Sequence, residues 1–215
     1  MSRSTTKNQN IIEPIDYSFY KVYTTDTEFL KKFVKRIQNL KAQYKLSGKT
    51  NDEIVRQYFV EIFSWSVFTP HVLNILSEIF KKHKITQVLD PCAGSAFHTF
   101  LINSKLGIDV RTVDIQDETD SWLPIEEMDG RKLLQELSSK EHKSSALLLS
   151  WVDYESLTIE LLEEYQGKMV ISVGNYEGNS LNYLQMLEEK YKLKKRIILQ
   201  MPWNLEEKIE IYLKK

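Results

Sequence analysis

From residue 85 onward, short apolar runs alternate with amphipathic stretches, and this alternation restricts the fold more than any other feature of the chain. Two of the runs, Ala146–Trp151 (ALLLSW) and Met169–Gly174 (MVISVG), are apolar almost throughout, instead of at every second position. Continuous apolar strands are typical of a parallel sheet that helices cover on both faces. Successive parallel strands need crossover connections, which the intervening helices provide. The sequence therefore predicts a three-layer α/β domain.

The elements of this domain can be assigned from the period of their apolar residues. Helices are expected at residues 93–105, 130–137, 155–165 and 180–191. Strands are expected at residues 85–90, 107–115, 146–151, 169–174, 196–201 and 208–213, and a further strand position precedes residue 129. Pro70 suits the first turn of a preceding helix, with Thr69 as its N-cap. No helix separates the last two strands, so they are expected to form an antiparallel pair.

Residues 1–63 are expected to form an N-terminal leader and helical extension, and residues 64–215 to form the α/β domain. Residues 1–14 have the polar composition of a flexible leader. Helices are predicted at about 26–46 and 51–63, and one face of the first is basic. This face is either solvated or a phosphate-contacting patch for RNA or DNA. In the second case its nucleic-acid-binding residues are Lys31, Lys32, Lys35 and Arg36.

Composition limits the kinds of protein that this chain can be. The net charge of −1 excludes polyanion binding by total charge alone, so nucleic-acid binding requires a local patch. Cys92 is the only cysteine, which excludes an internal disulfide and fits a reducing compartment. No apolar run approaches the roughly 20 residues that span a bilayer. We expect an intracellular protein, cytoplasmic rather than nuclear, with no membrane segment and, because its histidines are scattered, no metal site.

The loop after the first predicted strand has the composition of a ligand-binding turn. Residues 90–96 read Asp-Pro-Cys-Ala-Gly-Ser-Ala, and small residues let the backbone approach a ligand beyond the carboxyl ends of the strands. Of the glycines that a dinucleotide-binding fingerprint requires, only Gly94 is present. Asp90 is placed either to accept hydrogen bonds from a ligand amine or to fix the loop. A tight structural turn is the alternative interpretation. Cys92 is either a nucleophile, if the helix N-terminus lowers its pKa, or a small buried residue.

Two further acidic residues follow the next strand positions. Asp114 ends the second strand, where a carboxylate can hydrogen-bond ribose hydroxyls or simply cap the strand. Asp129 precedes Gly130, and it either receives an adenine amino group or caps the helix that begins there. Both residues are expected at the same edge of the sheet as the loop.

Together these elements resemble the Rossmann-like S-adenosylmethionine-dependent methyltransferases. Asp90–Ser95 resembles the D-P-x-x-G-S form of the family's first motif, common in enzymes that methylate nucleic-acid amino groups. Phe68-Thr69-Pro70 resembles the F-x-T-P element placed against the methionine end of the cofactor. The resemblance implies S-adenosylmethionine as cofactor and a mostly parallel seven-stranded sheet with an antiparallel terminal strand. The cofactor-binding residues that it implies are Phe68, Thr69, Pro70, Asp90, Pro91, Cys92, Ala93, Gly94, Ser95, Asp114, Ile115, Asp129 and Gly130.

The fourth motif departs from this pattern. Amino-group methyltransferases usually end the fourth strand in D/N/S-P-P-Y/F/W, whereas this chain has Ser-Trp-Val-Asp-Tyr at residues 150–154. Ser150 is the candidate polar partner of the target amine, and Trp151 or Tyr154 the candidate stacking ring. Asp153 instead suits a general base for a hydroxyl target. The prolines that would fix the backbone are absent.

The resemblance implies a methyltransferase that acts on RNA or DNA. The alternative is a methyltransferase-like scaffold that no longer catalyses and that binds RNA or protein partners, as the altered fourth motif would allow. A third interpretation, an NAD-dependent oxidoreductase, conflicts with the missing glycines and the terminal hairpin. The sequence leaves open the methylated atom, the oligomeric state, the protein partners and the role of residues 1–50.

Overall fold

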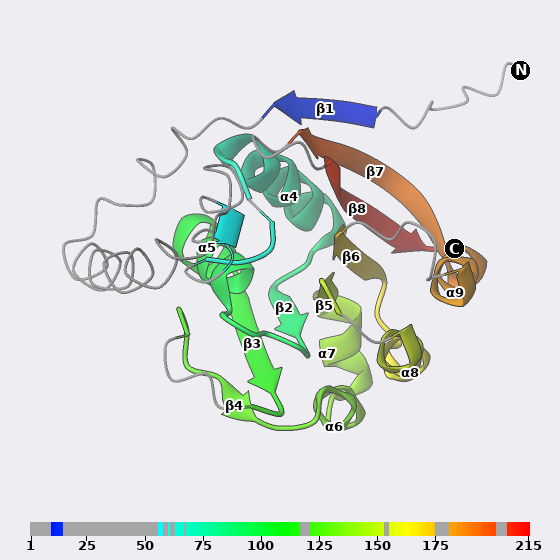
Figure 1. Ribbon diagram of the computed structural model, residues 1–215. Coiled ribbons are helices and arrows are strands. Elements are labelled where there is room, and N and C mark those ends of the chain that lie inside the picture. The colour runs from blue at the N-terminus through cyan, green and yellow to red at the C-terminus, as the bar shows by residue number, and fades with distance from the viewer. Residues whose placement is uncertain are drawn as a thin grey trace, which may run out of the picture.

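The computed structural model describes residues 10–14, 56–57, 60, 63–66, 68–116, 121–152, 155–174, 181–200 and 206–215. These residues form an eight-stranded sheet in the order β1-β7-β8-β6-β5-β2-β3-β4 (Figure 1). The strands are β1 (Asn10–Pro14), β2 (Gln87–Asp90), β3 (Asp109–Asp114), β4 (Glu126–Glu127), β5 (Ser145–Ser150), β6 (Met169–Gly174), β7 (Tyr191–Gln200) and β8 (Glu206–Lys214).

The direction of the strands confirms the predicted sheet. β2 lies parallel to β3 and β5, β3 to β4, and β5 to β6. β8 lies antiparallel to both β6 and β7, as the absence of a helix between the last two strands predicts. The described sheet therefore contains the seven predicted strands, of which β8, between β6 and β7, is the antiparallel one. β1 is an eighth strand that was not predicted.

β1 corrects one expectation of the sequence analysis. Residues 10–14 do not belong to a flexible leader, because they pair in parallel with β7, Asn10 opposite Arg196 and Pro14 opposite Gln200. Half-buried Ile11 packs against the core. Pro14 occupies the last position of this edge strand, where a residue without an N–H is tolerated. β1 covers the backbone edge that β7 would otherwise expose.

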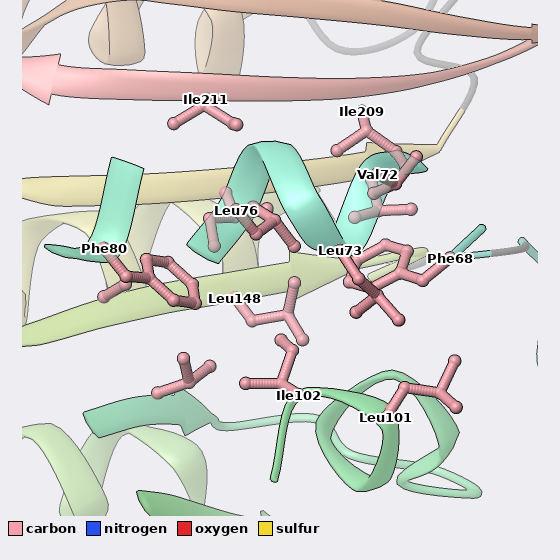
Figure 2. Packing of buried hydrophobic residues seen from close by; sticks show 14 of the residues in the cluster. Phe68, Val72, Leu73, Leu76, Phe80, Leu101, Ile102, Leu148, Ile209 and Ile211 are labelled. Carbon is pink, nitrogen blue, oxygen red and sulfur yellow. The ribbon is translucent and has the colours of Figure 1, made fainter. Parts of the chain in front are cut away.

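Helices cover both faces of the sheet and produce the predicted three layers (Figure 1). α4 (Pro70–His83) and α5 (Phe97–Leu106) pack on one face, against alternate strand residues such as Leu148, Ile209 and Ile211 (Figure 2). α6 (Gly130–Gln135), α8 (Glu155–Glu164) and α9 (Leu181–Lys190) pack on the other face. Thr69 caps α4 as predicted, since its hydroxyl accepts a hydrogen bond from the Val72 backbone N–H at 3.1 Å.

One helix start and one additional helix differ from the sequence expectations for identifiable reasons. α5 begins at Phe97 instead of residue 93, because Gly94 and Ala96 have left-handed φ angles of +49° and +55°. A short helix, α7 (Ser139–Ser144), was not predicted. Its signal is present in the sequence as a capping box, in which Ser138 and Glu141 bond each other's backbone N–H.

Among the described residues, no helix combines the length and the hydrophobicity needed to cross a bilayer. The same part of the chain contains no group of three or more His, Cys, Asp or Glu side chains that is arranged to hold a metal ion.

Candidate active site

The loop that follows β2 is hydrogen-bonded to the end of β3. The Ala93 N–H donates to the Val113 carbonyl at 3.1 Å, and the Gly94 N–H donates to the Asp114 Oδ2 at 2.9 Å. The left-handed φ of Gly94 favours glycine, and no atom lies within 4 Å of the position that a Cβ would take there. The loop therefore presents bare backbone to open space at the carboxyl ends of the strands.

Asp90 joins the end of β2 to α5. Its carboxyl group is buried, and the Thr99 hydroxyl on α5 lies 3.1 Å from Oδ2. Burial raises the pKa of Asp90 to about 7, Thr99 opposes that rise, and the negative charge of Asp114 adds to it. These contacts join the end of β2 to α5, and a hydrogen bond from a ligand amine to Asp90 stays a prediction.

Asp114 at the end of β3 contacts the loop, and Ile115 follows it in the chain. The second carboxylate oxygen of Asp114 accepts from the Gln116 N–H at 3.3 Å, so this side chain organises backbone on both sides. Ile115 is 70% exposed, which is unusual for a large apolar residue. An acid that holds the Gly94 backbone is thus followed directly by an exposed apolar side chain.

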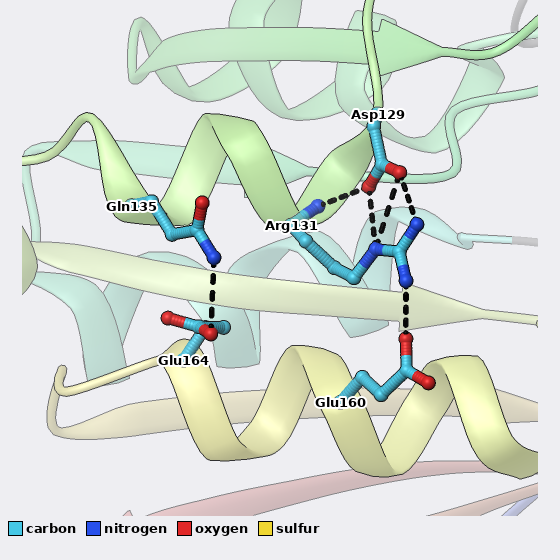
Figure 3. A network of polar contacts seen from close by, with 5 residues as sticks. All are labelled: Asp129, Arg131, Gln135, Glu160 and Glu164. Atoms are coloured by element: carbon cyan, nitrogen blue, oxygen red, sulfur yellow. Dashed lines mark hydrogen bonds and ion pairs between the residues drawn. The ribbon is translucent and has the colours of Figure 1, made fainter.

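Asp129 caps α6, which is one of the two roles predicted for it. Its carboxylate accepts from the Arg131 backbone N–H at 2.8 Å and pairs with the Arg131 guanidinium, which also binds Glu160 at 2.7 Å (Figure 3). These bonds to Arg131 hold the pKa of Asp129 below its ordinary value. A shallow groove starts here and runs between the exposed sides of α6 and α8. Contact with adenine stays a prediction for this residue.

Gly130 is required by close packing. A Cβ at this position would lie 2.5 Å from the Pro91 carbonyl oxygen and 2.6 Å from the Pro91 Cβ. The absence of a side chain therefore lets the first turn of α6 touch the loop after β2.

Several predicted cofactor residues have structural contacts in this protein. Phe68 is fully buried and stacks on His98 with ring centroids 4.3 Å apart, while Pro70 opens α4 at the surface. Ser95 donates its hydroxyl hydrogen to the Phe63 carbonyl. Burial, reinforced by nearby carboxylates, raises the pKa of the Cys92 thiol to about 12, which makes it a poor nucleophile.

The backbone at the end of β5 has a conformation that proline cannot adopt. Trp151 has a left-handed φ of +50°, whereas the proline ring holds φ near −65°. The Trp151 N–H also donates to the Val173 carbonyl at 2.9 Å, a bond that proline would remove. The lack of prolines after Ser150 is therefore a difference in backbone geometry as well as in sequence.

Ser150 is joined to a buried histidine that the sequence analysis treated only as one of four scattered histidines. Its hydroxyl oxygen lies 3.0 Å from Nδ1 of His98, and Nε2 of the same ring lies 2.9 Å from the Ser66 carbonyl oxygen. The Ser64 hydroxyl oxygen is 3.2 Å from Nε2. We call these four residues the His98 network. Burial lowers the pKa of His98 to about 4, against the opposing effect of the Ser66 carbonyl, so the imidazole is neutral at pH 7.

Neighbouring positions of α5 connect the two halves of the site. His98 contacts Ser150 at the end of β5, and the next residue, Thr99, contacts Asp90 at the end of β2. Because β2 and β5 are adjacent parallel strands, one turn of α5 contacts the ends of both, at Asp90 and at Ser150.

An aromatic and cationic surface lies beside Trp151. The Trp151 indole N–H donates to the Ser66 hydroxyl at 2.6 Å, and its ring centroid lies 5.6 Å from that of Trp65. Trp65 is 46% exposed, and the Arg56 guanidinium carbon lies 5.3 Å from the centroid of the Trp65 ring. We call Arg56, Trp65 and Trp151 the tryptophan surface.

Glu207 on β8 is a second residue that the sequence analysis missed. Its side chain is 1% exposed, and in the described part of the chain neither carboxylate oxygen has a hydrogen-bond partner. Burial raises the pKa of Glu207 to about 7, and the nearby positive charge of Arg56 opposes this rise. An acid at the start of a terminal strand gives no sequence signal of such burial.

The remaining predicted site residues lie outside the described residues. They are Asp153 and Tyr154 after the fourth strand, and Lys31, Lys32, Lys35 and Arg36 on the basic face of the first predicted helix.

Comparison with known proteins yields structures but no sequence relatives. Neither a family model nor a curated protein matches this sequence. An S-adenosylmethionine-dependent methyltransferase from Archaeoglobus fulgidus is similar with a TM-score of 0.51 and 14% identity, over 74% of this chain and 98% of that one. TrmN from Thermus thermophilus is similar with a TM-score of 0.49 and 14% identity, over 69% of this chain. The chain spans only about half of TrmN, since 49% of that protein is covered.

Proposed function

We propose that this chain, which has the Rossmann-like methyltransferase fold, is an S-adenosylmethionine-dependent methyltransferase that acts on RNA or DNA. The observation that carries the proposal is the loop after β2, whose bare backbone at Gly94 is held by Asp114 beyond the carboxyl ends of the strands. Ligands of open α/β sheets bind at this edge, and an acid after the second strand suits a ribose.

The residues present fit the cofactor. Gly94 leaves room for a close approach, Asp114 offers carboxylate oxygens for ribose hydroxyls, and exposed Ile115 offers an apolar surface for a base. When bound, S-adenosylmethionine supplies an activated methyl group, and the protein contributes position and electrostatics. Ser150, at the end of the next strand along the sheet, is placed to hold the acceptor group.

The nucleic-acid part of the proposal rests on the tryptophan surface. Exposed indole rings bind unpaired bases by stacking, and a neighbouring guanidinium favours the phosphate backbone. Trp65 and Arg56 present both features next to Trp151, which follows Ser150 directly. A base stacked here would lie beside the hydroxyl of Ser150.

The second candidate is the methyltransferase-like scaffold without catalysis. The left-handed backbone of Trp151 favours it, because the fourth motif then lacks the geometry that two prolines impose. Such a protein would bind RNA through the tryptophan surface without transferring a methyl group.

Calorimetric titration with S-adenosylhomocysteine tests the cofactor site. We expect micromolar binding to the wild-type chain and a loss of roughly tenfold or more in Asp114→Asn, which keeps the side-chain volume but removes one acceptor oxygen. Asp109→Asn, at the exposed start of the same strand, is the matched control and should bind like the wild type. Absence of binding to the wild-type chain would refute the proposal.

Methyl transfer separates the two candidates. The wild-type chain is incubated with methyl-labelled S-adenosylmethionine and pools of unmodified single-stranded RNA or DNA oligonucleotides. Label in either pool supports the enzyme, and its position identifies the methylated atom. Cofactor binding without label in either pool, together with RNA binding that Trp65→Ala abolishes, would support the scaffold instead.

A further inference from the structure

We propose that His98 is a positioning residue that makes the Ser150 hydroxyl an obligate hydrogen-bond acceptor for the substrate. The inference rests on the proposed function and deepens it, because it assigns how the altered fourth motif holds its acceptor group. Its basis is the His98 network of Ser64, Ser66, His98 and Ser150.

The partners of the ring determine where its hydrogen lies. A backbone carbonyl can only accept a hydrogen bond, so Nε2, which lies 2.9 Å from the Ser66 carbonyl oxygen, carries the hydrogen. The Ser64 hydroxyl donates to that same carbonyl, which leaves its oxygen as a further acceptor for Nε2–H. A neutral imidazole carries a hydrogen on only one of its two ring nitrogens, so Nδ1 is unprotonated.

The unprotonated Nδ1 in turn determines the direction of the hydrogen bond from the Ser150 hydroxyl. The bond of 3.0 Å between them forms only when the serine O–H donates to Nδ1. The hydroxyl hydrogen is thereby used inside the protein, and the lone pairs of Oγ remain for a ligand. A serine in this state offers the substrate what an Asp or Asn oxygen offers: an acceptor for an N–H or O–H group.

The surroundings keep this arrangement rigid. His98 is buried, stacks on Phe68 at 4.3 Å and lies in the first turns of α5 next to Thr99, which bonds Asp90. An imidazole held so firmly in one tautomer fixes the serine rotamer without needing the prolines of the usual motif.

The same contacts distinguish positioning from acid–base or nucleophilic chemistry. A serine nucleophile needs a histidine that gains a proton, and a carboxylate normally stabilises the resulting imidazolium. In the His98 network a neutral carbonyl faces Nε2, and burial disfavours the charged ring. His98 therefore holds the serine hydrogen in place and does not remove it.

Nitrogen-detected NMR of the chain with labelled histidines tests the tautomer without requiring activity. His98→Phe, which retains a ring against Phe68, assigns the His98 signals among the four histidines. We expect the neutral Nε2–H tautomer at pH 7, and a change in the Nδ1 shift in Ser150→Ala. An Nδ1–H tautomer, or a doubly protonated ring at pH 7, would overturn the proposal.

Transfer of the labelled methyl group to the oligonucleotide pool that accepts it tests the role. Ser150→Ala and His98→Phe should each lower kcat by about 100-fold with little change in KM, as misplacement of a reacting group does. Adding His98→Phe to Ser150→Ala should cause no further loss, because the two residues act as one unit. Ser150→Asn, which supplies its own acceptor oxygen, should restore most of the kcat lost in His98→Phe.

His142→Phe is the matched control, since His142 is equally buried but packs on the opposite face against Tyr165. It should leave kcat unchanged. Additive losses in the double variant, or failure of Ser150→Asn to rescue His98→Phe, would show that His98 only supports the fold and would overturn the proposal. If the wild-type chain transfers no methyl group, the proposed function fails, while the tautomer measurement still decides the arrangement of His98 and Ser150.

Discussion

The buried carboxyl group of Asp90 should make the stability of this protein fall as the pH rises from about 4 to 7. Burial raises the pKa of Asp90 from 3.8 to about 7 in the folded chain. In the pH window between these values the folded state holds a proton that the unfolded state has lost. The free energy of unfolding therefore decreases with pH across this window.

The size of the effect follows from the shift. One pH unit corresponds to 1.36 kcal/mol, so the rise of the Asp90 pKa from 3.8 to about 7 costs about 4 kcal/mol once both states are ionised, near pH 8. Asp90→Asn removes the ionisation but keeps an oxygen for the Thr99 hydroxyl. Relative to the wild type, this variant should gain about 4 kcal/mol of stability between pH 4 and pH 8.

Urea unfolding of the wild type and Asp90→Asn at a series of pH values measures this difference. The loss of any hydrogen bond in the variant appears at every pH, so only the change with pH tests the reasoning. Asp109→Asn, which removes an exposed carboxylate on a neighbouring strand, is the control for the change in stability with pH. A difference curve for Asp90→Asn that is flat, or that slopes the other way, would refute the assignment of a buried, protonated Asp90.

Three further outcomes follow from individual contacts. Gly130→Ala should lower the free energy of unfolding in urea by about 1–3 kcal/mol and bind S-adenosylhomocysteine more weakly, because its Cβ would overlap Pro91. Gly107→Ala, whose Cβ would have no atom within 4 Å, should leave binding unchanged. Cys92 should react with iodoacetamide at pH 8 at least about 50-fold more slowly than free cysteine, because its pKa is raised. Mass spectrometry measures the labelling of this single-cysteine chain, and labelling as fast as that of free cysteine would mean that the Cys92 pKa is ordinary. Trp151→Pro should destabilise the fold by about 3 kcal/mol or more in urea unfolding and should not raise methyl transfer; a stable, more active variant would contradict the left-handed backbone.

Local patterns were sufficient to predict the layered sheet. β5 and β6 are buried on both faces, and that requirement produces runs such as Met169–Gly174, whose bounds agree with the observed strand. The antiparallel direction of β8 followed from the short connection before it. Thr69 was predicted as a helix cap, and a cap was one of the two roles predicted for Asp129, because a cap is a bond between residues two or three positions apart.

Other features depend on partners that are distant in sequence. Residues 93–96 have a composition compatible with helix, but the bond from Gly94 to Asp114, 20 positions away, holds them as an open loop. β1 is a strand only because the edge of β7 accepts it.

The candidate site divides in the same way. The sequence alone indicated the loop after β2, Asp114 and Ser150, because each follows a strand and all parallel strands end at one edge of the sheet. The tertiary structure decided that His98 determines the hydroxyl direction of Ser150, 52 positions away, and that Trp151 adopts a left-handed backbone. Hydrogen-bond direction depends on which groups burial brings together, and no short stretch of sequence contains that information.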